Sequence, residues 1–362
     1  MERFAFIIHP LEAKRDIARR YPFVRFLPES WIEWGLKHKG PMEISHITGV
    51  RSATGVEAEG WFVGCPLTPK QMLDLPIDFV WAKIIGAGRI AADLGAKIVG
   101  LGAFTSVVGD GGITVAKNLD IAVTTGNSYT VATAIEGALK AAEMMDIQPS
   151  QATAAVVGAA GSIGRTCAEI MARQTADLVL VDKNAGRMEE AAEALRKSAA
   201  GTVSTTTDVR AGVERADIVI AVSSAVHAII EPSYIKCGAV VCDVARPRDV
   251  SARVARERDD VLVIEGGVVA IPGDVEFNFS FGFPPKTAYA CMSETMMLAL
   301  EGRYESYTLG RDLSVAQVDE ISNMASKHGF RLAGFRSFEK AVTEEQIDKI
   351  RENARGKKSA ST

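Results

Sequence analysis

The clearest hydrophobic pattern lies between residues 152 and 270, where short apolar runs alternate with segments of helical spacing. The runs have few polar interruptions and read ATAAVV, ADLVLV, ADIVIAV, GAVVCDV and DVLVIE. Continuous runs of this length are typical of strands that helices cover on both faces of a parallel sheet. We therefore predict a Rossmann-like, doubly wound parallel α/β domain over residues 146–283.

The flanking segments indicate a second α/β domain. Residues 1–145 contain the strand-like runs FAFIIH, AKIVGLGAF and DIAVTT, together with two long helical patterns. After a Pro-Pro pair, an apolar helix carries Cys291, and an amphipathic helix follows it. We expect the Rossmann-like domain to be inserted into a catalytic, substrate-binding domain built from residues 1–145 and 284–362. The polar tail is expected to fray from about residue 355.

Composition and charge exclude several classes of protein. The 362 residues are 47% hydrophobic and 24% charged, as in globular proteins. The net charge of −4 argues against a general nucleic-acid binder. No apolar run has the length of a membrane helix, and the first residues lack the features of a signal peptide. We expect a cytoplasmic protein without stable membrane insertion, and a homo-oligomer stays open.

The five cysteines and five histidines are scattered along the chain. The cysteines form no CxxC pair, and the histidines form no HExxH motif or other cluster with metal-ligand spacing. We therefore expect reduced thiols and no metal site.

A glycine-rich turn, GAAGSIG, connects the first strand of the Rossmann-like domain to its first helix. Glycine permits a tight turn and a close approach of the backbone to a pyrophosphate, which then faces a helix N-terminus. Because the turn lies between a strand and a helix and further strands follow, we predict that it binds a dinucleotide. The residues predicted to contact the cofactor here are Gly158, Ala159, Gly161, Ser162, Ile163 and Gly164.

The end of the second strand bears on the choice between NAD(H) and NADP(H). Asp182 lies 18 residues beyond Gly164, where an acidic residue usually binds the 2′-hydroxyl of the NAD ribose. Lys183 and Arg187 follow closely and have the charge to bind a 2′-phosphate, although both also suit the solvated start of a helix. The sequence therefore leaves the choice of cofactor open.

Two loops in the first domain carry hydroxyl and amide groups. LGAFTSVV contains Ser106, and TTGNSYT contains Thr125, Asn127 and Ser128 immediately before a helical pattern. Such groups can donate hydrogen bonds to a carbonyl or a phosphate. Taken alone, the second loop is better explained by helix capping, for which Asn and Ser are favoured.

Cys291 lies near the start of the helix that follows the two prolines. With Thr287 as a possible N-cap, the thiol lies about one turn into the helix, where the positive helix N-terminus and Lys286 favour a reactive thiolate. Cysteine is also among the most frequently buried residues, and this helix is apolar on nearly all sides. The residues alone leave both a packing role and a nucleophilic role open.

Several separate segments resemble the long-chain fatty acyl-(acyl-carrier-protein) reductases, an aldehyde-forming family of cyanobacterial type. The matching stretches include FAFIIHPLEA, GVEAEGWFVGCPLTPKQM, LGAFTSVV, TTGNSYTVA, GAAGSIG and YACMSETMMLALEGR. The resemblance extends from about Phe4 to Phe330. The glycine turn is generic, whereas the ordered occurrence of LGAF[TS]S, TTGN and Ala-Cys-x-x-Glu is specific.

The resemblance implies that Cys291 attacks an acyl thioester of acyl carrier protein or coenzyme A. Hydride from a nicotinamide cofactor then reduces the acyl-enzyme to a fatty aldehyde. Ser106, Thr125 and Asn127 become candidate donors for the oxyanion. An apolar tunnel is expected for the acyl chain, and the adaptable side chains that suit its wall are those of Met292, Met296 and Met297.

One residue departs from what the resemblance implies. The family is expected to use NADPH, whereas Asp182 stands where an NAD ribose is normally bound, so NADP(H) and NAD(H) both stay open. Two other functions also stay open. The first is a small-substrate dehydrogenase of shikimate or amino-acid type, in which TTGN binds a polar substrate and Cys291 is a core residue. The second is a non-catalytic nucleotide-binding sensor.

Overall fold

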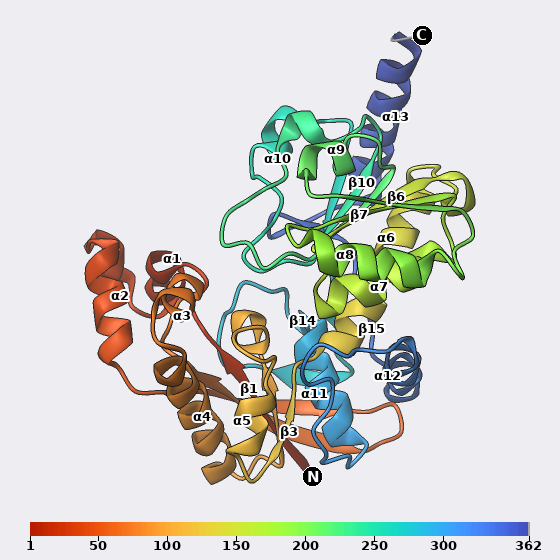
Figure 1. Cartoon of the computed structure of the whole chain (residues 1–362). Coiled ribbons are helices and arrows are strands. Elements are labelled where there is room, and N and C mark those ends of the chain that lie inside the picture. The colour runs from red at the N-terminus through yellow and green to blue at the C-terminus, as the bar shows by residue number, and fades with distance from the viewer. Residues whose placement is uncertain (361–362) are drawn as a thin grey trace. The chain divides into compact units, whose positions relative to one another are not determined.

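The computed structural model describes residues 1–360, except the side chain of residue 20, and contains two compact units. Unit 1 consists of residues 1–129, 269–312 and 319–331. Unit 2 consists of residues 130–268, 313–318 and 332 onward. Figure 1 follows the chain through both units. Each unit is built around a six-stranded sheet, and both sheets contain parallel strands.

The sheet of unit 1 has the order β13-β2-β3-β1-β4-β5. Strands β3, β1, β4 and β5 are parallel to one another, whereas β2 and β13 pair antiparallel at one edge. The bounds of the strands are β1 Glu2–Ile8, β2 Met42–Arg51, β3 Glu57–Gly64, β4 Ile98–Leu101, β5 Ala122–Thr124 and β13 Gly273–Glu276. Because parallel strands end at the same edge, the loops after β1, β3, β4 and β5 gather there.

The helices of unit 1 alternate with its strands, and α11 packs against β1 and β4. Gly100 on β4 makes this packing possible, because a Cβ at that position would overlap Thr295 of α11. The α-helices are α1 Ala13–Arg20, α2 Glu29–His38, α3 Pro69–Asp74, α4 Ile77–Asp93, α5 Ile113–Lys117 and α11 Ala290–Leu300. The 3-10 helices are η1 Pro22–Phe26 and η2 Ala103–Ser106.

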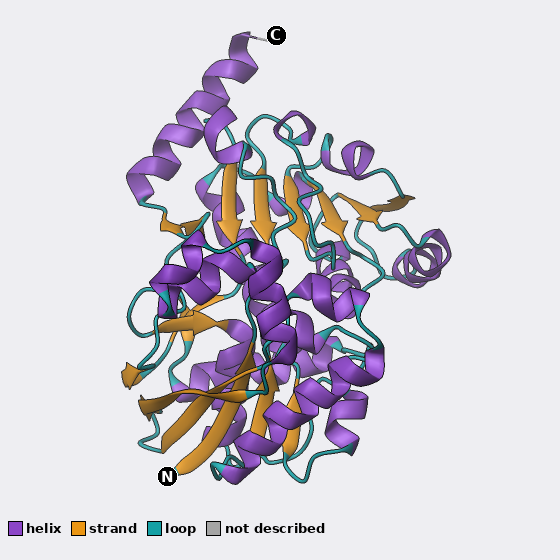
Figure 2. Cartoon of the chain, turned by 90° about the vertical axis from the view of Figure 1, so that its left-hand side faces the viewer, coloured by secondary structure: helices purple, strands orange, loops and turns teal. Residues whose placement is uncertain are grey.

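The sheet of unit 2 is wholly parallel and has the order β11-β10-β9-β6-β7-β8. The bounds of its strands are β6 Thr153–Val157, β7 Asp177–Val181, β8 Thr202–Thr206, β9 Ile218–Ala221, β10 Val240–Asp243 and β11 Leu262–Glu265. The strand order reverses between β6 and β9, as in the doubly wound dinucleotide-binding sheet. Figure 2 shows these strands side by side with helices around them. The predicted Rossmann-like α/β fold is thus confirmed.

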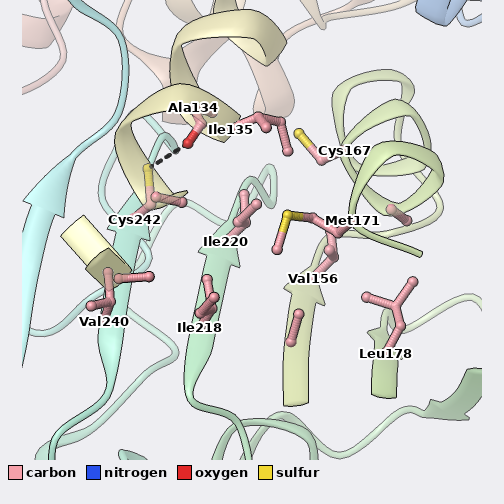
Figure 3. Close-up of a cluster of buried hydrophobic side chains, with 14 of the residues drawn as sticks. Ala134, Ile135, Val156, Cys167, Met171, Leu178, Ile218, Ile220, Val240 and Cys242 are labelled. Atoms are coloured by element: carbon pink, nitrogen blue, oxygen red, sulfur yellow. Dashed lines mark hydrogen bonds between the residues drawn. The ribbon is translucent and has the colours of Figure 1, made fainter. Parts of the chain in front are cut away.

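Helices α6 and α7 pack on one face of this sheet (Figure 3). Cys167 and Met171 of α7 belong to a buried apolar layer that also contains Ile220 of β9 and Cys242 of β10. The Cys242 thiol lies 3.7 Å from the carbonyl oxygen of Ala134 on α6. The helices are α6 Asn127–Met144, η3 Pro149–Gln151, α7 Ser162–Ala172, α8 Ala185–Leu195, α9 Val209–Val213, η4 Pro232–Tyr234, α10 Val254–Glu257 and α13 Glu344–Ala360.

The remaining elements lie where the chain passes between the units or near its end. Helix α12 contains residues of both units. Strands β14, β12 and β15 form a three-stranded sheet, and β16 pairs with β17. Their bounds are α12 Val315–His328, β12 Val268–Ala270, β14 Thr287–Tyr289, β15 Arg331–Leu332, β16 Arg336–Ser337 and β17 Lys340–Ala341.

The division of the chain differs from the predicted boundaries at 145/146 and 283/284. Most of α6 belongs to unit 2, because its apolar side chains pack on the parallel sheet. The last segment also belongs to unit 2 rather than returning wholly to unit 1. The tail predicted to fray from about residue 355 is helical to Ala360, with Arg355 paired to Asp146 at 2.6 Å. The last two residues of that predicted tail lie outside the described residues.

Candidate functional site

The loop after β5 and the start of α11 meet at the carboxyl edge of the unit 1 sheet. Gly126 follows β5 with φ +74°, a left-handed conformation that favours glycine. A Cβ at Gly126 would overlap the Cα and Cβ atoms of Cys291. The predicted TTGN loop and the predicted nucleophile are therefore in direct backbone contact, although they are far apart in the sequence.

Glu294 holds this loop in place from one turn further along α11. Its carboxylate is wholly buried and accepts hydrogen bonds from the Thr124 hydroxyl at 2.5 Å and the Ser128 hydroxyl at 2.6 Å. It also accepts the Thr308 hydroxyl and the backbone N–H of Tyr129, both at 3.0 Å. Four donors thus satisfy a carboxylate that would be costly to bury without partners.

Glu294 also caps helix α6. The first N–H groups of a helix have no acceptor within it, and a negative charge is favourable at that end. Tyr129 is the third residue of α6, and its N–H donates to Glu294. The capping function that the sequence assigned to the polar side chains at the start of α6 is thus performed here by a carboxylate from α11.

Cys291 is the accessible residue of an otherwise buried helix. Every other residue of α11, all of which the structure describes, is buried, whereas Cys291 is half-buried. The predicted N-cap at Thr287 is wrong, because Thr287–Tyr289 pairs as strand β14 and Tyr289 is the N-cap. Cys291 is therefore the second residue of the helix and lies closer to the helix N-terminus than predicted.

Lys286 has a different partner from the one that its sequence position suggested. Its ammonium group donates to Asp274 at 2.7 Å, and this hydrogen bond raises the pKa of Lys286. The sequence indicated two sources of positive potential at Cys291, Lys286 and the helix N-terminus. Of these, the N-terminus of α11 remains.

The three predicted oxyanion donors have different environments. Thr125 donates its hydroxyl proton to the Thr308 carbonyl oxygen at 2.6 Å, and Ser106 donates to the Ala103 carbonyl oxygen at 2.7 Å. Asn127 directly follows Gly126, which contacts Cys291, and is buried with 5% of its surface exposed. In the described part of the chain, the Thr125 and Ser106 side chains are hydrogen-bonded to the backbone, whereas the Asn127 side chain is not.

His9 is a residue at this edge that the sequence did not single out. It follows β1, and its Nε2 accepts the backbone N–H of Phe104, in the loop after β4, at 3.0 Å. Its Nδ1 lies 3.2 Å from the Pro10 carbonyl oxygen, which fixes the neutral tautomer with the proton on Nδ1. Desolvation lowers the pKa of His9 to about 4. His9 thus orders the loop that contains Ser106.

A run of aromatic rings leads to the start of α11. The sequence FNFSFGF places phenylalanine at every second position from Phe277 to Phe283. The rings of Phe277 and Phe281 lie 4.9 Å apart, those of Phe281 and Phe283 lie 5.2 Å apart, and those of Phe283 and Tyr289 lie 4.3 Å apart. Phe281, Phe283 and Tyr289 are half-buried, so an apolar surface ends at the N-cap of the helix that carries Cys291.

In unit 2, the glycine turn connects β6 to α7, and the space available for a side chain differs at each of its three glycines. Gly158 has φ +89°, and a Cβ there would lie 2.8 Å from the backbone nitrogen of Ser223. A Cβ at Gly164 would overlap the Gly158 carbonyl oxygen. Gly161, the N-cap of α7, has only that same oxygen within 4 Å of its Cβ position, at 3.3 Å. Two glycines are thus needed for packing, whereas Gly161 leaves space beside the helix N-terminus.

The structure places the other predicted cofactor residues around this turn. Ala159 is buried, and Ser162, Ile163 and Gly164 form the first turn of α7. Asp182 follows β7 and accepts the backbone N–H of Ala160 at 3.1 Å. The next two predicted cofactor residues, Lys183 and Arg187, have exposed side chains. The geometry therefore fits either the ribose 2′-hydroxyl of NAD(H) or the 2′-phosphate of NADP(H). The role of each residue stays a prediction.

A buried pair of aspartates lies behind the glycine turn. Asp249 accepts both the backbone N–H of Ser223 at 2.8 Å and the Ser223 hydroxyl at 2.5 Å. Asp243 accepts the backbone N–H of Val250 at 3.0 Å. Burial raises the pKa of Asp243 to about 6 and that of Asp249 to about 7. Since Ser223 contacts Gly158, this pair supports the backbone of the predicted nucleotide site.

Within residues 1–360, the side chains and the helices limit the sites available for a metal ion and for crossing a membrane. No group of three or more His, Cys, Asp or Glu side chains in this range is arranged to hold a metal ion. Every helix in the same range falls short of the length or the apolarity that crossing a bilayer requires.

Comparisons with known proteins match parts of this arrangement. Residues 138–265, which lie within the 130–268 segment of unit 2, match the shikimate/quinate 5-dehydrogenase family model. The chain is 26% identical over 343 residues to the long-chain acyl-[acyl-carrier-protein] reductase of Synechococcus elongatus, covering 89% of this chain and 95% of that protein. It is 32% identical over 337 residues to the aminotransferase PigE of Serratia sp., covering 92% of this chain. The chain spans only 37% of the length of PigE.

Solved structures resemble the chain more remotely. The L-tryptophan dehydrogenase of Nostoc punctiforme is 11% identical, with a TM-score of 0.41, over 98% of this chain and 89% of that one. The 5-ketofructose reductase of Gluconobacter sp. is 12% identical, with a TM-score of 0.36, over 97% of each chain. The parallel sheet, its glycine turn and the match of unit 2 to a dehydrogenase family model establish an NAD(P)-binding fold of the oxidoreductase type.

Proposed function

We propose that this protein reduces an acyl thioester to an aldehyde with NAD(P)H, through an acyl-enzyme on Cys291. The observation that carries the proposal is the position of Cys291. It is the accessible residue at the N-terminus of a buried helix, in contact with the TTGN loop. A cysteine with a packing role alone would not need the buried carboxylate and the left-handed glycine that hold the loop against it.

In the first step, the Cys291 thiolate attacks the thioester carbonyl carbon, and the carrier leaves as a thiolate that takes up a proton. The partial positive charge at the N-terminus of α11 stabilises the attacking thiolate. Bound NAD(P)H would supply a hydride to the acyl carbon, and the carbon–sulfur bond to Cys291 would then break to release the thiolate. The products are then an aldehyde, the regenerated Cys291 thiolate and the oxidised nicotinamide.

Both steps place a negative charge on the former carbonyl oxygen, which requires hydrogen-bond donors. We assign this function to the Asn127 side chain and to the backbone N–H of Met292. Asn127 follows the glycine that contacts Cys291, and Met292 is in the first turn of α11, where N–H groups lack an acceptor within the helix. Thr125 and Ser106 instead order the loops through their bonds to backbone carbonyls.

Glu294 is a positioning residue in this proposal. Its bonds to Thr124, Ser128 and Tyr129 hold the loop that carries Asn127 against the turn of α11 that carries Cys291. Because these bonds are internal and satisfied, the loop does not have to reorganise when the oxyanion forms.

The substrate is proposed to carry a long apolar acyl chain on acyl carrier protein or coenzyme A. The half-buried rings of Phe281, Phe283 and Tyr289 provide apolar surface beside the start of α11. The similarity to the acyl-[acyl-carrier-protein] reductase over 89% of this chain supports the same substrate class.

The residues of unit 2 fit the cofactor. Gly161 leaves open the space at the N-terminus of α7 where a pyrophosphate binds in this fold. Asp182 lies at the end of β7, where a ribose hydroxyl is bound, and the neighbouring Lys183 is exposed.

The decisive experiment is to incubate the protein with acyl thioesters of different chain lengths without NAD(P)H and to measure its mass. We expect a gain of one acyl group that is absent in Cys291→Ser. Cys237→Ser, which changes another cysteine that is not fully buried, is the matched control and should keep the adduct. The absence of an adduct at every chain length, or full aldehyde production by Cys291→Ala, would refute the proposal.

A small-substrate dehydrogenase is the second candidate, because the shikimate/quinate dehydrogenase model matches residues 138–265. That match lies within the nucleotide-binding unit and includes no residue around Cys291, so it bears on the cofactor more than on the substrate. Turnover of hydroxy or amino acids with NAD(P) that survives Cys291→Ala would favour this candidate. The absence of any nicotinamide turnover would favour the non-catalytic sensor.

A further inference from the structure

Residues 13–39 form a small helical subdomain of unit 1 with its own apolar core. Helix α1, the 3-10 helix η1 and helix α2 enclose the side chains of Ala13, Val24, Ile32 and Leu36. In Figure 1 these helices lie at one end of unit 1, in the red segment of the chain. We refer to residues 13–39 as the α1–α2 segment.

Large aromatic side chains project from the outside of this segment. Phe23 is 64% exposed, and Phe26 is 82% exposed. Trp31 is 68% exposed and Trp34 67%, whereas Ile32 on the same helix is buried. The inward positions of α2 thus already supply its core, and the outward aromatic rings add nothing to it. Such a group of exposed aromatic residues within a short segment marks an interaction surface.

The α1–α2 segment is basic in an acidic protein. It contains seven Lys or Arg and three Asp or Glu residues, a net charge of +4, whereas the whole chain has −4. Lys14, Arg25 and Lys39 are exposed, and the Arg25 guanidinium lies 5.8 Å from the centre of the Phe26 ring. Exposed basic and exposed aromatic side chains therefore occur within the same short segment, and at Arg25 and Phe26 they are adjacent.

We propose that the α1–α2 segment binds peripherally to an anionic lipid surface. Tryptophan and phenylalanine insert into the boundary between headgroups and acyl chains, while Lys and Arg attract anionic lipids. This association does not require a spanning helix. The proposal rests on the surface of this segment and does not depend on the reaction at Cys291.

Charge and shape argue against two other occupants. A second copy of this chain would bring two segments of net charge +4 together, which is unfavourable. An acidic protein would complement the charge, but protein anchors are usually aromatic side chains held in pockets. Rings that are 64–82% exposed project outward and suit a deformable headgroup layer.

The test is co-sedimentation of the full chain with vesicles of phosphatidylcholine alone and of phosphatidylcholine with about 30% phosphatidylglycerol as the anionic lipid. We expect binding to the anionic vesicles that falls as NaCl rises, and a blue shift of tryptophan fluorescence. The Phe26→Ser/Trp34→Ser variant should bind on the order of tenfold more weakly. Lys14→Glu/Lys39→Glu should weaken binding by more than about tenfold.

Matched controls distinguish the contribution of this segment from the effect of losing apolar side chains or reversing charge elsewhere in the protein. Val56→Ser/Ile113→Ser removes two exposed apolar side chains elsewhere in unit 1, and Lys197→Glu/Arg215→Glu makes the same charge change on exposed positions of unit 2. Both controls should bind as the parent protein does. Thermal unfolding of all four variants is measured alongside, so that a loss of binding by a folded protein is distinguished from a loss of fold.

Three outcomes would overturn the proposal. The first is no binding to anionic vesicles at any salt concentration. The second is an equal loss of binding in a control variant and in its matched segment variant. The third is binding of an acidic acyl carrier protein that Phe26→Ser/Trp34→Ser abolishes, without binding to vesicles, which would identify a protein partner instead.

Discussion

The two candidate sites are assembled in opposite ways. In unit 2, the glycine turn is one continuous segment between β6 and α7, and its glycines contact one another's backbone. In unit 1, the surroundings of Cys291 come from the loop after β5, the first two turns of α11 and Thr308. The nucleotide site is thus encoded locally, whereas the Cys291 site depends on contacts between distant segments.

This difference shows where a buried charge is useful. A short loop between a strand and a helix needs only backbone freedom, which glycine supplies. Two segments that are far apart in the chain need a specific connection. Glu294 provides it, because one carboxylate accepts hydrogen bonds from Thr124, Ser128 and Thr308 together. Substitutions can therefore be chosen that affect the Cys291 site of unit 1 or the nucleotide site of unit 2, but not both.

The largest expected effect is that of Glu294→Ala. Removing the carboxylate leaves buried hydroxyl donors and the Tyr129 N–H without their acceptor, so we expect a loss of about 3–5 kcal/mol of unfolding free energy. Urea unfolding would measure it. Ser293→Ala, on the same buried turn, removes one hydroxyl bonded to the Tyr289 carbonyl oxygen and should cost only about 1 kcal/mol. Equal stabilities of the two variants would contradict the central role of Glu294.

A comparison of two glycines tests the local site. Gly164→Ala forces a Cβ against the Gly158 carbonyl oxygen and should destabilise unit 2 by about 1–3 kcal/mol while weakening cofactor binding. Gly161→Ala should destabilise the protein much less than Gly164→Ala, because its Cβ would lie 3.3 Å from the Gly158 carbonyl oxygen rather than overlap it. It should nevertheless weaken NAD(P)H binding about tenfold in a fluorescence titration, because the Cβ enters the phosphate space. Unaltered cofactor affinity in Gly161→Ala would show that the pyrophosphate lies elsewhere.

The buried aspartates of unit 2 predict a pH dependence of stability. The pKa of Asp249 is about 7 in the folded protein, above its value in the unfolded chain of about 3.9, so between these values the folded state binds more protons. The stabilisation is present below about pH 4 and is lost as the pH rises through 7. Urea unfolding of Asp249→Asn should therefore show a larger gain over the parent protein at pH 8 than at pH 5.

An exposed carboxyl provides the control for this measurement. Glu193→Gln changes an exposed carboxyl of the same unit and should shift unfolding by a similar small amount at both pH values. A pH-independent difference between Asp249→Asn and the parent protein would contradict the prediction.

The smallest expected effect concerns cofactor preference. Asp182→Ala removes the carboxylate at the end of β7 and should weaken use of NADH about tenfold more than use of NADPH. Lys183→Ala/Arg187→Ala should have the opposite effect if those exposed cations bind a 2′-phosphate. Ratios of kcat/KM for the two cofactors measure both changes. Identical ratios in all variants would show that none of the three residues contacts the ribose.

The success of the sequence-based predictions follows the same division. Continuous apolar runs predicted the parallel sheet of unit 2, because strands buried on both faces require them. The predicted N-cap at Thr287 was wrong, because this residue lies in strand β14, and pairing within the β14-β12-β15 sheet overrode a local capping preference. His9 gave no signal, because its significance comes from an N–H that Phe104 donates from a neighbouring strand's loop.

The sequence by itself determined the nucleotide-binding fold and marked Cys291 as a residue with two possible roles. Both rest on local patterns, namely apolar runs, glycine spacing and a helix start. Only the tertiary structure decided that Cys291 is the accessible residue of its helix and that Gly126 lies against it. It also decided that Glu294 joins the two segments. These features depend on contacts between residues far apart in the chain, which no local pattern specifies.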